Sequence, residues 1–166
     1  MNTENVLDLL GYNYWATNLI LDATSKVAPA QFIASVSPDP GWGSLRGILV
    51  HTLDTEIGWR QNVQKLELSP DLVEQDFPDI LTLKSRWATE RENWFSFCKS
   101  LDRQALNAPY AYQSGDGSIR KRLVWQTIVH VVNHGTQHRS EAAYLLTGYG
   151  NSPGDLDFNL YLHAQT

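Results

Sequence analysis

Apolar residues return every three or four positions in four long segments of this sequence, and this spacing marks the buried face of an α-helix. The segments cover residues 4–27, 45–66, 80–101 and 122–147. Prolines and glycines gather between them, most densely in the stretch SVSPDPGWG, so loops separate the helices. Amphipathic helices must bury their apolar faces against one another. The sequence therefore predicts an all-α fold, an up-down four-helix bundle of antiparallel helices.

Residues near the segment ends support these boundaries. Ser44 and Asp79 are suited to be N-caps, because their side-chain oxygens can accept hydrogen bonds from the first free N–H groups of a helix. The pair Asp116-Gly117, within YAYQSGDGSIR, indicates a short β-hairpin before the last helix. The C-terminal tail is expected to be mostly loop, with one short helix near 156–163.

Length and charge narrow the classes of function. The 166 residues fit one domain, 1–166. The net charge is -5 and the longest basic run, IRKR at 119–122, is short, which argues against binding to nucleic acid. The N-terminus lacks the pattern of a signal peptide, and no apolar run approaches the roughly 18 residues of a membrane span. We expect a cytoplasmic protein without nucleic-acid or membrane partners. Cys98, the single cysteine, should be buried and inert.

Three of the five histidines lie in the stretch HVVNHGTQHR, at positions 130, 134 and 138. Along a helix they form one stripe, but the first and last are about 12 Å apart along the axis. A metal ion bonded to imidazole nitrogens at about 2.0–2.1 Å therefore takes one adjacent pair, His130 with His134 or His134 with His138. Gly135 stands where metalloproteases of the H-E-x-x-H type carry their catalytic glutamate, so the protein is not a metalloprotease of that type. His51, in another predicted helix, is the candidate third ligand.

Four stretches, taken in this order, resemble the DinB/YfiT-like family of metal-binding four-helix bundles. They are LLGYNYWATNLIL, GSLRGILVHTLDTEIGW, HVVNHGTQHRSEAAYLLTGYG and PGDLDFNLYL. The resemblance implies that His51, His134 and His138 bind one divalent metal ion per chain, zinc or nickel. It also implies a homodimer and a metal-dependent enzyme acting on a small-molecule substrate, either a thiol-dependent S-transferase with a low-molecular-weight thiol as cosubstrate or a hydrolase. The alternative is a non-catalytic metal-binding protein of the stress response.

Three further residues are candidates to support the ligands. His130 either hydrogen-bonds near the site or is a packed neutral histidine. Glu141, in a position where the family often has glutamine, could orient a ligand imidazole, approach the ion itself, or be a solvated or arginine-paired carboxylate. Asp54 lies about one turn after His51, so it is either a support for that ligand or a surface carboxylate.

We expect Arg139 to have a structural role, and three glycines inside predicted helices need an explanation. We expect Arg139 to tie down the acidic tail at Asp155 or Asp157. Three glycines fall inside predicted helices, where each costs about 1 kcal/mol relative to alanine. Close helix approach, space for a ligand, or simple tolerance would explain them. These glycines are Gly47, Gly58 and Gly135.

Overall fold

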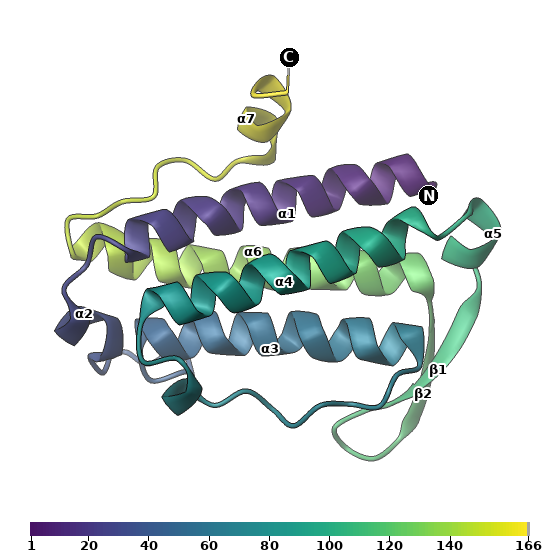
Figure 1. The fold of residues 1–166 in the computed structure, drawn as a ribbon, viewed down its shortest axis with the longest axis horizontal. Helices are drawn as coiled ribbons and strands as arrows, with labels where there is room; N and C mark the ends of the chain where they lie inside the picture. The colour runs from purple at the N-terminus through teal and green to yellow at the C-terminus, as the bar shows by residue number, and fades with distance from the viewer. Residues whose placement is uncertain (166) are drawn as a thin grey trace.

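The structure, a computed structural model, describes residues 1–165. Its four long helices are α1 (Thr3–Thr24), α3 (Leu45–Gln64), α4 (Ile80–Lys99) and α6 (Val124–Gly148). They lie side by side in one bundle (Figure 1), with α1 against α4 and α6, and α3 against the same two helices. The predicted all-α four-helix bundle is confirmed.

The directions of the helices do not simply alternate. In Figure 1, α3 and α4 run the same way, and α1 and α6 run the opposite way. The connection 65–79, which contains the short 3₁₀ helix η1 (Glu74–Asp76), returns along the whole bundle before α4 begins. It is long enough to do so, because an extended chain advances about 3.3 Å per residue and a helix only about 1.5 Å. The expectation that all four helices are antiparallel to their neighbours is corrected in this respect.

The helix starts follow from capping. The hydroxyl of Ser44 accepts the N–H of Gly47 over 2.9 Å at the start of α3. The carboxylate of Asp79 accepts the N–H of Thr82 over 2.9 Å at the start of α4. Both predicted N-caps are confirmed.

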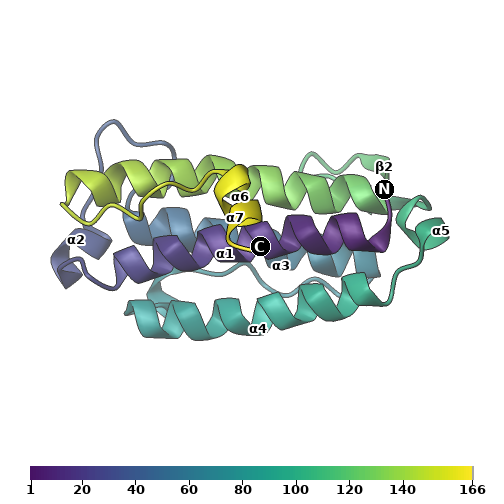
Figure 2. The ribbon, with the colours of Figure 1, turned by 90° about the horizontal axis from the view of Figure 1, so that it is seen from above.

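Shorter elements join the long helices. The predicted hairpin is present, with β1 (Pro109–Gln113) antiparallel to β2 (Ile119–Leu123). Because β2 continues to Leu123, α6 begins two residues later than expected. The C-terminal helix α7 (Phe158–His163) lies across α1 (Figure 2). The sequence did not predict two short helices, α2 (Pro29–Ile33) and α5 (Arg103–Leu106).

The core of the bundle contains polar side chains as well as apolar ones. Glu56 is 1% exposed and accepts hydrogen bonds from the amide of Asn13 (2.8 Å) and the hydroxyl of Tyr14 (3.0 Å). Nearby, the guanidinium of Arg60 donates two hydrogen bonds to Glu90, at 2.5 and 2.9 Å. A buried polar group costs free energy unless it is paired, so these contacts specify how α1, α3 and α4 pack together.

Cys98 is fully buried, as predicted, and burial raises the pKa of its thiol to about 12. Among residues 1–165, no helix combines the length and the apolar character required to cross a membrane.

Candidate metal centre

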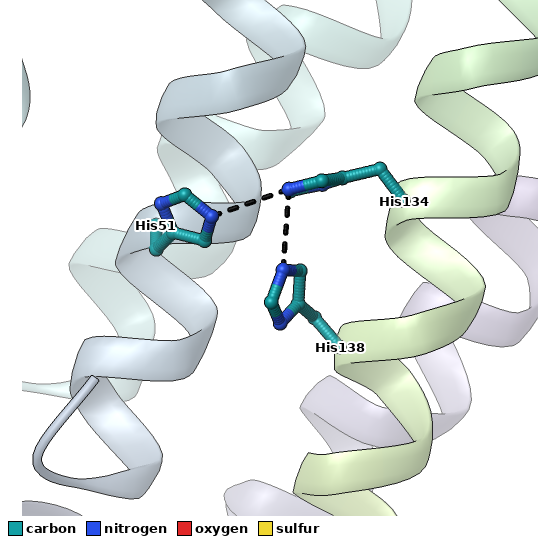
Figure 3. Close-up of side chains that lie close together, drawn as sticks. All are labelled: His51, His134 and His138. Carbon is teal, nitrogen blue, oxygen red and sulfur yellow. Dashed lines mark hydrogen bonds between the residues drawn. The ribbon is translucent and has the colours of Figure 1, made fainter. Parts of the chain in front are cut away.

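Three histidines from two helices converge on one point between α3 and α6 (Figure 3). Nε2 of His134 lies 3.2 Å from Nε2 of His51 and 3.1 Å from Nε2 of His138. His134 and His138 are four residues apart on α6, so both point from the same face of that helix. The antiparallel packing of α3 on α6 then brings His51 opposite them. We call His51, His134 and His138 the histidine cluster.

The spacing of the cluster fits a metal ion. The candidate ligand atoms of the three rings all lie within 4.8 Å of one another. Two nitrogens bonded to one tetrahedral ion at 2.0–2.1 Å are about 3.3 Å apart, close to the two Nε2–Nε2 distances of 3.2 and 3.1 Å in the structure. Hydrogen bonding alone explains the arrangement poorly, since Nε2 of His134 has one N–H or one lone pair but faces two nitrogens. A cation would accept lone pairs from all three rings, and imidazole suits both zinc and nickel.

The surroundings of His51 and His134 favour the neutral form of these two rings, which is the form that binds metal. Burial, followed by the charge of His138, lowers the pKa of His134 to about 3. Burial and then the charge of His138 lower the pKa of His51 to about 4. At neutral pH both imidazoles therefore have a lone pair available for a cation.

Glu141 contacts the ring of His138 on the side that faces away from the cluster. Its Oε2 lies 2.7 Å from Nδ1 of His138, the ring nitrogen that faces away from the cluster. When Nδ1–H donates to this carboxylate, the lone pair of Nε2 is directed at the cluster. Of the roles considered for Glu141, this contact supports that of orienting a ligand imidazole.

Trp42 covers the cluster from the loop before α3, a contact that sequence reasoning missed. Its ring stacks on His51 with centroids 3.4 Å apart and planes at 10°, and it meets His138 edge-on at 5.7 Å. Gly47 makes this approach possible, because a Cβ there would lie 1.9 Å from the carbonyl oxygen of Trp42. The sequence did contain one indication of this contact: Gly47 lies inside a predicted helix, directly after the loop that carries the aromatic residue Trp42.

The other two supporting candidates lie outside the cluster. The ring of His130 packs edge-on against Trp59 (5.0 Å) and lies 5.9 Å from the ring of His134. Within residues 1–165 it has no hydrogen bond, in agreement with a packed histidine. The carboxylate of Asp54 accepts the N–H of Leu72 over 2.8 Å, so it anchors the connection 65–79 to α3.

Arg139 does not bind the acidic tail, and that expectation was wrong. Its Nη1 donates to the amide oxygen of Asn13 over 2.5 Å, and its Nη2 donates to the hydroxyl of Thr136 over 2.9 Å. Arg139 follows His138 by one residue, about 100° around α6, so it faces α1 instead of the tail. Gly135 leaves room for this pair, since a Cβ there would lie 2.6 Å from the guanidinium.

Comparisons with known proteins agree with this geometry. The model of the DinB family matches residues 1–166, which is the whole chain. The chain is also similar to "Protein DinB" of Bacillus subtilis (strain 168), with 28% identity over 164 residues that cover 93% of this chain and 91% of that protein. The resemblance seen in the sequence is thus confirmed by a match along the full length, and the chain belongs to the DinB family.

Proposed function

We propose that His51, His134 and His138 bind one divalent metal ion, zinc or nickel, and that the loaded protein is a metal-dependent enzyme. The observation that carries this proposal is the convergence of three Nε2 atoms, with neighbours at 3.1 and 3.2 Å. Three neutral imidazoles are the protein ligands of one type of catalytic zinc site, in which the fourth position takes water or substrate.

The position of Glu141 favours an enzyme over a structural or sensory metal site. A purely structural site fills its coordination sphere with protein ligands. Glu141, the nearest candidate for a fourth ligand, has one carboxylate oxygen on Nδ1 of His138, on the far side of that ring. The cluster of possible ligands within residues 1–165 contains only the three histidines. This arrangement supports an open position for a small molecule.

The chemistry we propose is thiol-dependent S-transfer, in which the sulfur of a low-molecular-weight thiol attacks an electrophilic small molecule, with hydrolysis as the related option. A divalent ion at the cluster would act as a Lewis acid that lowers the pKa of a thiol or water bound to it. The protein's own contribution is to hold two of the three rings in place: Glu141 orients His138, and Trp42 stacks on His51. The homodimer and the cytoplasmic location stay predictions from the sequence.

Elemental analysis of protein purified without an affinity tag tests the metal site. We expect about one divalent ion per chain in the unaltered protein and none in His134→Ala. His163→Ala, a histidine of α7 outside the cluster, is the matched control and should keep the metal. Absence of metal under replete conditions would refute the site.

Turnover is tested separately. A panel of low-molecular-weight thiols with electrophilic acceptors, and a panel of ester and amide substrates, should be assayed with loaded and chelator-stripped protein. Turnover that depends on the metal is expected. Metal binding without turnover in either panel would instead support the non-catalytic alternative.

A further inference from the structure

A cavity with a basic lining lies beside the hairpin, away from the histidine cluster. It has a volume of about 410 Å³ and lies between α3, at Trp59 and Asn62, and the hairpin, at Tyr112, Arg120 and Arg122. Side chains alternate along a strand, so Arg120 and Arg122 lie on one face of β2. The lining contains two arginines and no carboxylate, in a protein whose net charge is -5.

Two aromatic rings hold the guanidinium of Arg122 in place, and no carboxylate of residues 1–165 neutralises its charge. Its guanidinium carbon lies 4.3 Å from the ring centre of Trp59 and 4.4 Å from that of Tyr112. One of its N–H groups, on Nη2, donates to the hydroxyl of Tyr112. Within the described part of the chain, no carboxylate pairs with Arg122, whereas Arg120 pairs with Asp116 at 2.8 Å. Nε and Nη1 of Arg122 have no hydrogen-bond partner among residues 1–165 and can donate to a ligand.

The chemistry of this cavity suits an anion. A guanidinium presents N–H groups in a planar fork that matches the oxygens of carboxylate and phosphate. Stacking on two aromatic rings fixes the orientation of the fork before any ligand arrives, so less conformational entropy is lost on binding. A merely structural arginine that docks the hairpin on α3 would show the same stacking but would gain nothing from a bound anion.

We propose that the cavity around Arg122 is an anion-binding site that takes the carboxylate or phosphate group of a small molecule. Trp59 and Tyr112 orient the guanidinium, and Arg122 supplies the charge-assisted hydrogen bonds. The site needs no metal ion.

The position of the cavity relates it to the histidine cluster. The ring of Trp59 packs on His130 at 5.0 Å, and His130 lies 5.9 Å from His134. The rings of Trp59 and His130 thus connect the cavity to the cluster through successive contacts. That a substrate spans both sites rests on the proposed metal function, whereas anion binding at Arg122 does not.

NMR titration tests the proposal directly. Inorganic phosphate and succinate are added separately at constant ionic strength, with sodium chloride as the reference, while the Nε–H signal of Arg122 and the indole signal of Trp59 are followed. We expect saturable shifts with at least one of the two anions, and the comparison shows whether phosphate or carboxylate is preferred. Arg122→Gln should weaken binding about ten-fold or more. Lys121→Gln, the same charge change at the next residue, should bind as the unaltered protein does.

Two further arms distinguish the possible failures. Backbone amide signals of 109–123 show whether the hairpin is intact in Arg122→Gln. If the hairpin unfolds in that variant, Arg122→Lys takes its place as the test. Arg122→Lys keeps the charge but lacks the planar fork, so it should bind anions with intermediate affinity. His134→Ala should leave anion binding unchanged even if no metal is ever found. No saturable shift with either anion, or binding that is unchanged in Arg122→Gln, would overturn the proposal.

Discussion

The carboxylate of Glu141 lies 2.7 Å from Nδ1 of His138, one turn along the same helix. The contact occupies the ring nitrogen that cannot reach the histidine cluster and leaves Nε2 for a cation. A side chain that is itself outside the cluster therefore determines which nitrogen of His138 is available.

Replacing Glu141 should weaken metal binding without abolishing it. Carboxylates that hold ligand histidines typically contribute ten- to hundredfold in metal affinity, so we expect a loss of about that size in Glu141→Ala and a smaller loss in Glu141→Gln. Competition with a chromophoric chelator measures the affinity. Ser140→Ala, at the preceding exposed position, is the control and should bind normally. Equal affinities in all of these proteins would show that Glu141 does not support the site.

Gly47→Ala should displace Trp42 from His51. The new Cβ would meet the carbonyl oxygen of Trp42 at 1.9 Å, so the loop must move away from α3. We expect a loss of about 1–3 kcal/mol in the free energy of unfolding, measured with urea, and a changed indole NMR signal for Trp42. Gly58→Ala is matched, because it lies on the same helix with no atom within 4 Å of the added Cβ. It should gain up to about 1 kcal/mol. A loss in both variants, or in neither, would contradict the packing described.

Glu56 should make stability fall as pH rises. Burial raises the pKa of its carboxyl from 4.5 to about 7, although hydrogen bonds from Asn13 and Tyr14 favour the charged form. The folded state thus binds this proton more tightly than the unfolded state does. Its contribution is fully present below pH 4.5 and is lost as pH rises through about 7.

Two measurements check this behaviour. Relative to Glu56→Gln, the free energy of unfolding should fall by on the order of 3 kcal/mol across that range of pH. Carbon-13 NMR of the Glu56 carboxyl follows the titration directly in the unaltered protein. A carboxyl that titrates near its ordinary value would disprove the prediction.

Cys98 should be unreactive toward thiol reagents while the protein is folded. It is fully buried on α4, and burial raises the pKa of its thiol to about 12, so almost no thiolate is present at neutral pH. A chromogenic disulfide reagent should react with one thiol per chain in denaturant and, without denaturant, only as fast as the protein opens. Rapid labelling of the native protein would show that α4 is less tightly packed than described.

Much of the fold follows from local patterns. The spacing of apolar residues locates the four long helices, since each must bury one face, and Ser44 and Asp79 set two of their starts through their own side chains. The pair Asp116-Gly117 places the hairpin, where Gly117 adopts φ of 81°. Local patterns did not predict the relative directions of the helices. The connection 65–79 runs back along the bundle, so α3 and α4 are parallel (Figure 1).

The sequence by itself determined which face of α6 presents His134 and His138, because two residues four apart on a helix share a face. The helical rise also limited the ligands on that helix to one adjacent pair. Only the tertiary structure decided that His51 meets this pair, that Trp42 covers it and that Arg139 faces Asn13. These contacts join residues distant in the chain, and they depend on how the helices pack, which no local spacing records.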